Sequence, residues 1–117
     1  GAIGLLVAAL AKRMGAAEVI VSDYSAFRLD MARTLGATRT VNPGAGDSLE
    51  DAVAAATAGK GVDKTLECVG REETMIQAMT LLKKKGLATV VGIFENPQVT
   101  IPVMRLVNHE IRIQVSQ

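Results

Sequence analysis

The chain has 117 residues, of which 49% are hydrophobic, and this is enough to form the core of one ordinary domain. Its 13 basic and 12 acidic residues leave a formal charge of +1, which argues against nucleic acid or an anionic membrane as a partner. The longest apolar stretch covers about half of a bilayer span, and one cysteine and one histidine allow neither an internal disulfide nor a tetrahedral metal site. We therefore expect a cytoplasmic domain that binds no metal itself.

Apolar helical stretches alternate with short β-branched runs in the first half of the chain. A helix is predicted from Ile3 to Met14 and ends at Gly15, and a buried strand follows from Glu18 to Asp23. Ser25 is the expected N-cap of the next helix, which ends at Gly36. The residues of this helix that face inward are expected to be Leu29, Ala32 and Leu35.

The next two predicted elements are a short strand and a helix. The strand runs from Thr38 to Val41, and an Asn-Pro-Gly turn ends it. Ser48 and Asp51 have the spacing of a capping box, which predicts that a helix begins directly after Ser48. The side chains that this helix buries are expected to be Leu49, Val53 and Ala56.

The second half of the chain repeats the alternation. A strand from Val62 to Val69 precedes a helix from Glu72 to Lys85, with Gly86 as its C-cap. The three lysines at 83–85 then lie at a helix C-terminus, where the helix dipole favours cations. The remaining elements are predicted to be a strand at Leu87–Phe94, a short helix at Val103–Val107 and a strand at Glu110–Val115. Such an order is typical of an α/β protein with a parallel sheet.

Two glycines and one acidic residue form the clearest candidate site. Gly1 and Gly4 stand at the beginning of the first predicted helix, and Asp23 follows 19 positions after Gly4 (23 − 4 = 19). A helix N-terminus offers unpaired N–H groups to a pyrophosphate, and glycine permits its close approach. A carboxylate at about this offset accepts bonds from the ribose hydroxyls of NAD and repels the 2′-phosphate of NADP. The pattern therefore predicts NAD as the cofactor.

Six segments, taken in order, resemble the zinc-type medium-chain dehydrogenases, especially the sorbitol and threonine dehydrogenase branch. They are GAIGLL at residues 1–6, VIVSDYSAFRLDMARTLGA at 19–37, VDKTLECVG at 62–70, LLKKKG at 81–86, VVGIF at 90–94 and HEIRIQVS at 109–116. The resemblance spans nearly the whole chain. It implies that residues 1–117 are the NAD-binding domain of an enzyme that exchanges hydride between NAD and a zinc-bound alcohol or polyol.

The resemblance also implies a role for individual positions. At the pyrophosphate it places Gly1, Ala2, Ile3 and Gly4. It places Asp23 on the adenosine ribose and Arg28 beside the adenine. The riboses are then bordered by Cys68, Val69 and Gly70, and the nicotinamide by Val91, Gly92 and Ile93. No catalytic and no metal-binding residue is expected within the chain.

Further expectations concern the parent enzyme. The family fold is a Rossmann-type, doubly wound parallel sheet with strand order 3-2-1-4-5-6, and its first strand is expected to be missing from the N-terminus of this chain. The predicted strands at 18–23 and 62–69 therefore should not pair. The zinc and substrate domain is expected to be absent as well, so that the chain alone is inactive. The segment Val90–Val107 implies pairing of two cofactor domains in a homodimer, through an exposed sheet edge that carries Val99, Ile101 and Val103.

Several of these residues also have simpler interpretations. Asp23 could be a solvated turn residue, and Arg28 a surface residue of its helix. Cys68 is expected to be a small buried side chain without a reactive role, and His109 is not expected to be catalytic. None of the three lysines at 83–85 is assigned to a site.

Two other classes of protein remain as alternatives to a dehydrogenase domain. A class I methyltransferase also has a glycine turn followed by an acidic residue at the end of the next strand, and its later turn resembles Leu81–Gly86. That fold, however, closes its sheet with an antiparallel hairpin, for which the strand after Pro102 offers no partner. The second alternative is a non-catalytic module that binds a nucleotide.

Overall fold

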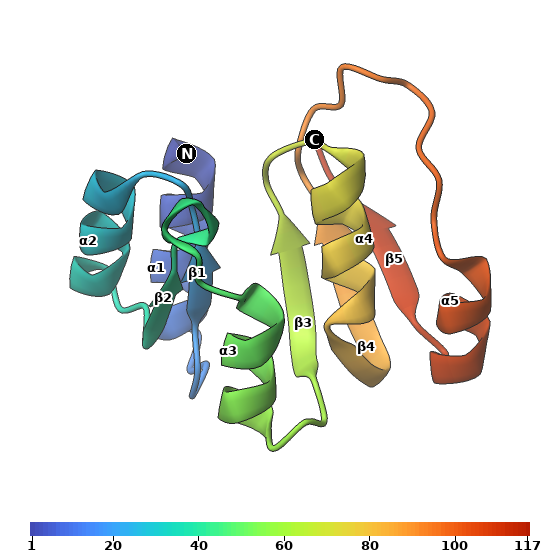
Figure 1. Cartoon of the computed structure of the whole chain (residues 1–117), viewed down its shortest axis with the longest axis horizontal. Helices are drawn as coiled ribbons and strands as arrows, with labels where there is room; N and C mark the ends of the chain where they lie inside the picture. The colour runs from blue at the N-terminus through green and yellow to red at the C-terminus, as the bar shows by residue number, and fades with distance from the viewer. The chain divides into compact units, whose positions relative to one another are not determined.

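The computed structural model describes residues 1–117, which divide into two compact units, Gly1–Gly59 and Lys60–Gln117. Each unit has its own sheet, and in each unit helices alternate with strands along the chain (Figure 1). Every strand pair in both sheets is parallel. The α/β class predicted from the sequence is therefore confirmed.

The first unit consists of three α-helices, one short 3-10 helix and two strands. In chain order these are α1 (Ala2–Arg13), β1 (Ile20–Ser22), α2 (Ala26–Thr34), β2 (Arg39–Val41), the 3-10 helix η1 (Pro43–Ala45) and α3 (Leu49–Thr57). β1 and β2 pair along three positions, from Ile20 opposite Arg39 to Ser22 opposite Val41. The buried side chains of this unit are Leu5, Ala8, Val19, Leu29, Ala32, Val41 and Val53.

Two serine caps predicted from the sequence are present in the first unit. The Ser25 hydroxyl accepts from the Arg28 N–H at 3.3 Å, and the Ser48 hydroxyl accepts from the Asp51 N–H at 3.1 Å. Each bond satisfies one of the N–H groups that a helix N-terminus leaves without a partner. The starts of α2 and α3 are thus local properties of the sequence.

The second unit is a three-stranded sheet with helices beside it. Its elements are β3 (Val62–Glu67), α4 (Glu72–Thr80), β4 (Leu82–Val90), α5 (Val103–His109) and β5 (Arg112–Val115), and the strand order is β3-β4-β5. The core is a cluster of five buried residues. Partly buried side chains from the loop after β4 and from α5 pack against this cluster. The cluster comprises Met75, Met79, Leu82, Ala88 and Val90.

The predicted end of the helix beginning at Glu72 was wrong. The helix ends at Thr80, and the residues that were expected to complete it belong to β4. Leu82 is 1% exposed and pairs with Val62 of β3, with an irregularity in the ladder before Lys64 and Leu87 pair. Burial of Leu82 in the sheet core outweighs the helical propensity of the lysines. The residues moved from the predicted helix end into the strand are Lys83, Lys84, Lys85 and Gly86.

Other strand ends also differ from the prediction. β4 ends at Val90 rather than Phe94. The Val91 N–H makes the last ladder bond, to the Glu67 carbonyl of β3, and the Gly92 N–H bonds to the same carbonyl instead of continuing the ladder. The strand predicted to end at Asp23 is confined to the three residues of β1, for which β2 offers partners. Leu35, expected to face inward, is 38% exposed, because α2 ends one residue before it.

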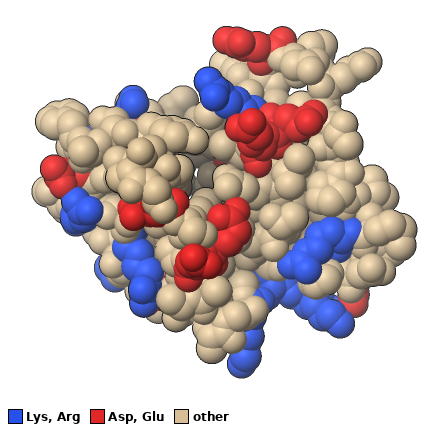
Figure 2. Space-filling view, in the orientation of Figure 1, with Lys and Arg blue, Asp and Glu red and all other residues tan.

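Two further observations bear on partners. No helix combines the length and the apolar character needed to cross a membrane. On the face shown in Figure 2, acidic and basic side chains are interspersed rather than gathered into one large patch. The charge distribution on that face therefore adds nothing in favour of a polyanionic partner.

Candidate functional site

The N-terminus of α1 is free of any side-chain cap. Gly1 occupies the N-cap position, and the first bond within the helix is donated by the Leu5 N–H to the Gly1 carbonyl at 3.2 Å. The preceding N–H groups of the first turn, at residues 2–4, are not used by the helical ladder. Together with the positive end of the helix dipole, they can bind a phosphate.

Asp23 lies beside this helix start, directly after β1. Its Oδ2 is 3.1 Å from the Gly1 nitrogen, and its Oδ1 accepts from the Ser25 N–H at 2.9 Å and from Arg28 Nε at 3.2 Å. The fold therefore brings Gly1, Asp23 and Arg28 together, although they come from α1, the end of β1 and α2. These three residues, which the sequence analysis assigned to one site, lie side by side within the first unit.

The surroundings of Asp23 keep it ionised. Partial burial by itself would raise the pKa of Asp23, but the hydrogen bond from the Ser25 N–H and the nearby Arg28 guanidinium lower the pKa below its ordinary value of 3.8. At neutral pH the side chain is thus a carboxylate that can only accept hydrogen bonds. Such a group suits a ligand with paired hydroxyls.

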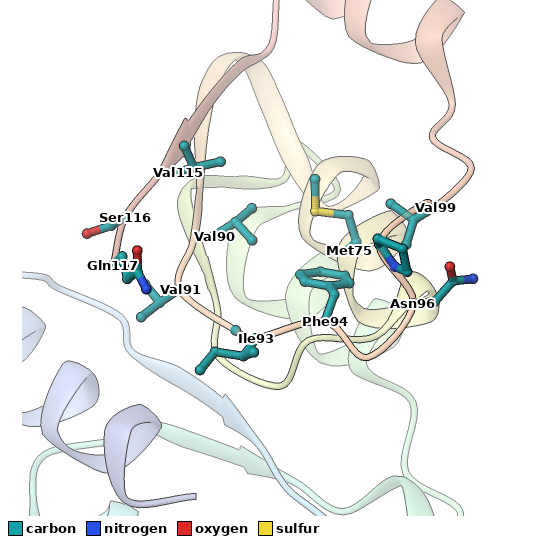
Figure 3. A pocket seen from close by; sticks show the side chains of 12 residues that line it. Met75, Val90, Val91, Ile93, Phe94, Asn96, Val99, Val115, Ser116 and Gln117 are labelled. Atoms are coloured by element: carbon teal, nitrogen blue, oxygen red, sulfur yellow. The ribbon is translucent and has the colours of Figure 1, made fainter.

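A second part of the predicted site lies in the second unit, where β3 and β4 end. The segment after β4 lines a cavity of about 510 Å³. In Figure 3 the side chains of Val91, Ile93 and Phe94 surround this cavity, with Met75 and Val115 on other walls. Its lining is mostly apolar, which suits a flat ring rather than a charged group.

Two glycines bring the loops after β3 and β4 into direct backbone contact. Gly70 has a φ of +87°, and a Cβ added there would lie 2.1 Å from the Ile93 carbonyl oxygen. A Cβ added at Gly92 would lie 2.3 Å from the Gly70 nitrogen. Glycine is therefore required at both positions. Within this unit the predicted residues at 68–70 and 91–93 are brought together.

Glu67 is a candidate site residue that the sequence analysis did not include. Its side chain is 3% exposed, and its Oε1 accepts from the N–H groups of Val69 and Gly70, both at 2.8 Å. The Thr74 hydroxyl donates to the same oxygen at 2.7 Å. The sequence feature that could have identified Glu67 is an acidic residue at the end of a predicted strand, three positions before a glycine in TLECVG. This carboxylate holds the loop that carries Val69 and Gly70.

Cys68 follows Glu67 and is half-buried. Burial, and secondarily the neighbouring Glu67 carboxylate, raise the pKa of the Cys68 thiol above its ordinary value of 9.0. The thiol is therefore protonated at neutral pH and is a poor nucleophile. This environment agrees with the expectation of an unreactive cysteine.

We predict that Cys68 reacts with iodoacetamide at neutral pH at least about tenfold more slowly than an exposed cysteine, because only the thiolate attacks. Mass spectrometry of the alkylated protein over time measures the rate. The urea-unfolded protein serves as the control, since its Cys68 has the reactivity of a free thiol. Equal rates in the folded and unfolded protein would contradict the assigned environment.

The other residues considered from the sequence have structural contacts. His109 Nε2 lies 2.6 Å from Arg105 Nη1, and Arg105 Nη2 donates to the carbonyls of Thr80 and Leu82. These bonds tie α5 to the end of α4 and the start of β4. Lys83 forms an ion pair with Asp63 on the neighbouring strand.

A metal ion has no evident ligand set in this chain. No group of three or more His, Cys, Asp or Glu side chains is arranged to hold one. A zinc site needs three or four protein ligands.

A helix N-terminus beside a carboxylate in the first unit, and an apolar cavity at the strand ends of the second, are features found in α/β nucleotide-binding proteins. The sequence profile of the family described as zinc-binding dehydrogenase matches residues 2–117. The chain belongs to this family.

Known relatives agree with this assignment. The chain is 37% identical to L-threonine 3-dehydrogenase of Marinomonas sp. (strain MWYL1) over 93 residues. These residues are 80% of the chain and 27% of the relative. It is 31% identical over 113 residues to sorbitol dehydrogenase of Bacillus subtilis, covering 97% of the chain and 32% of the relative. The chain thus spans about a third or less of the length of these relatives.

Solved structures give the same result. A zinc-binding dehydrogenase of Sinorhizobium meliloti 1021 bound to NADP matches with a TM-score of 0.86 and 36% identity, over 99% of this chain and 34% of that one. An alcohol dehydrogenase zinc-binding domain protein of Burkholderia ambifaria matches with a TM-score of 0.89 and 30% identity. The match covers 99% of this chain and 31% of that one. The chain therefore corresponds to the NAD(P)-binding region of zinc-dependent dehydrogenases.

Proposed function

We propose that the chain binds NAD and serves as the cofactor domain of a zinc-dependent oxidoreductase that exchanges hydride between NAD and an alcohol or polyol. The observation that carries this proposal is the pairing of the uncapped α1 N-terminus with the Asp23 carboxylate, 3.1 Å from the Gly1 nitrogen. The names of the threonine and sorbitol dehydrogenases support the substrate class.

The residues of the chain have separate roles in this proposal. Bound NAD supplies a ring carbon that accepts or donates hydride. The N–H groups of residues 2–4 bind the pyrophosphate, Asp23 accepts from the ribose hydroxyls and Arg28 lies beside the adenine. Residues 68–70 border the riboses, and residues 91–93 exclude water around the nicotinamide. Zinc and the substrate contacts are assigned to a separate part of the parent enzyme, without which this chain is inactive.

NAD rather than NADP is the proposed cofactor, although the relative from Sinorhizobium meliloti is bound to NADP. The reason is the ionised Asp23, which repels a phosphate at the 2′ position. Calorimetric titration of the complete gene product with NAD, NADP and S-adenosylmethionine tests the proposal. NAD should bind most tightly. Tight binding of S-adenosylmethionine alone would instead favour a methyltransferase, although the parallel pairing of β5 with β4 already argues against that fold.

We further propose that the strands of this chain contribute to a Rossmann-type, doubly wound parallel fold in the parent enzyme. Two observations support this proposal. β1 and β3 belong to different sheets, as expected, and each pairs with a neighbour along one edge only. The solved relatives are about three times longer than the chain.

A homodimer formed through residues 90–107 is the proposed assembly. The structure changes which residues can carry it. Val99 and Ile101, expected at an exposed strand edge, lie outside any strand and pack against the core of the second unit. Val103 and Val107 on α5 are instead 56% and 61% exposed. Exposed apolar groups of this kind are suited to burial against a second copy.

We predict that Val103→Lys combined with Val107→Lys converts the dimer into monomers, because two buried charges would oppose association. Sedimentation velocity of the complete gene product measures the change. Asn108→Lys, a polar substitution on the same helix, is the control and should leave the dimer intact. A double variant that sediments as the wild type does would place the interface elsewhere.

A further inference from the structure

Glu67 carries a charge that no cation of the fold neutralises. The three groups that bond its Oε1 are the Val69 N–H, the Gly70 N–H and the Thr74 hydroxyl, all of them neutral. Its Oε2 is buried and has no partner. The six ion pairs of the structure all involve other carboxylates. A buried carboxylate is normally paired with a cation or fully hydrogen-bonded, so Oε2 calls for an explanation.

The unpartnered oxygen lies directly behind the wall of the cavity. Gly92 lines that cavity, and a Cβ added at Gly92 would lie 2.4 Å from Glu67 Oε2. The oxygen therefore lies against Gly92, a residue of the cavity lining. The neighbours of this glycine that Figure 3 labels, Val91 and Ile93, line the same cavity. The Glu67 side chain itself is 3% exposed, so little solvent reaches its charge.

The two states of a nicotinamide cofactor differ in charge at the ring. The oxidised ring carries one positive charge and the reduced ring is neutral, while the adenosine diphosphate portion is the same in both. A fixed negative charge behind the ring pocket stabilises the oxidised form more than the reduced form. No contact between the carboxylate and the ring is needed for this effect.

We propose that Glu67 is a specificity-determining residue whose buried charge favours binding of the oxidised, cationic nicotinamide over the reduced one. This inference rests on the proposed function, since it requires a nicotinamide ring in the cavity beside residues 91–93. It extends that function from holding the cofactor to setting the relative affinity of its two redox states.

The test is the ratio of dissociation constants, Kd(NAD⁺)/Kd(NADH), measured by calorimetry on the complete gene product. Glu67→Gln retains an oxygen for the Val69, Gly70 and Thr74 donors but removes the charge, and should raise the ratio roughly tenfold. A change in loop position alone would weaken both forms together and leave the ratio unaltered. A ratio within twofold of wild type in the folded variant overturns the proposal.

Asp63→Asn is the matched control for this measurement. It removes one negative charge from the opposite end of the same strand, where the Asp63 side chain is 77% exposed and pairs with Lys83. Solvent screens a charge at that position. The ratio should therefore stay within twofold of wild type, and an effect as large as that of Glu67→Gln would show that burial beside the cavity is not the cause.

Thr74→Val keeps the test decisive if Glu67→Gln fails to fold, as judged by circular dichroism. This variant keeps the carboxylate and removes one donor to Oε1, so the remaining charge is less neutralised. The ratio should fall two- to threefold, by roughly the effect of one neutral hydrogen bond. An unchanged or increased ratio overturns the proposal. If the wild type binds neither NAD⁺ nor NADH, the proposed function itself fails.

Discussion

Replacement of Gly70 by alanine is expected to lower the free energy of unfolding by about 3 to 5 kcal/mol, because strain and overlap act together. The φ of +87° is unfavourable for any residue with a Cβ, and the added atom would lie 2.1 Å from the oxygen and 2.6 Å from the carbon of the Ile93 carbonyl. Both are backbone atoms and cannot rotate away. Urea unfolding monitored by circular dichroism measures the loss.

Gly15→Ala is the matched control for this prediction. Gly15 has a similar φ of +96°, but a Cβ added there meets no atom within 4 Å. The free energy of unfolding of Gly15→Ala should therefore fall by about 1 to 2 kcal/mol, the cost of backbone strain alone. The difference between the two variants isolates the overlap with Ile93. Equal losses would mean that the loops after β3 and β4 separate easily.

Asp23→Ala is expected to narrow the preference for NAD over NADP by about 1 to 3 kcal/mol, the usual scale for hydrogen bonds to a charged acceptor. Two effects combine, since the variant loses an acceptor for the ribose hydroxyls and no longer repels the 2′-phosphate. The pKa of Asp23 lies below 3.8, so the wild-type preference should be constant between roughly pH 5 and 8. It should decline only as acid protonates the carboxylate.

Two further variants separate these effects. Asp23→Asn retains an oxygen that can accept from the Ser25 N–H and so removes mainly the charge. It should restore NADP binding while preserving the start of α2. Asp30→Ala removes an exposed carboxylate from the same helix and should leave the preference unchanged. Competitive titration gives the affinities, and an unaltered preference in Asp23→Ala would make Asp23 a structural residue.

Local sequence signals predicted the parts of the fold whose causes are local. Ser25 and Ser48 cap helices because a hydroxyl reaches an N–H group three residues away. The spacing between Gly4 and Asp23 predicted that a helix start and a strand end would lie together, and the 3.1 Å contact between Gly1 and Asp23 is its structural counterpart. One helix and one strand between the two positions are sufficient for this juxtaposition.

Contacts between distant segments decided the features that the sequence analysis missed. Leu82 was assigned to a helix, and its pairing with Val62, twenty positions earlier, placed it in a strand. Val99 and Ile101 were expected at an open edge and instead pack against the core cluster. Propensity and periodicity describe one segment at a time, and they cannot report which segment will cover another.

Glu67 illustrates the difference between what the sequence determined and what only the tertiary structure determined. The sequence by itself determined the α/β alternation, the caps and a dinucleotide pattern, because these follow from the chemistry of neighbouring residues. Only the tertiary structure showed that an acidic residue lies 3% exposed behind Gly92, with one oxygen bonded three times and the other not at all. Burial arises when two loops meet, and their glycines allow an approach that no local pattern specifies.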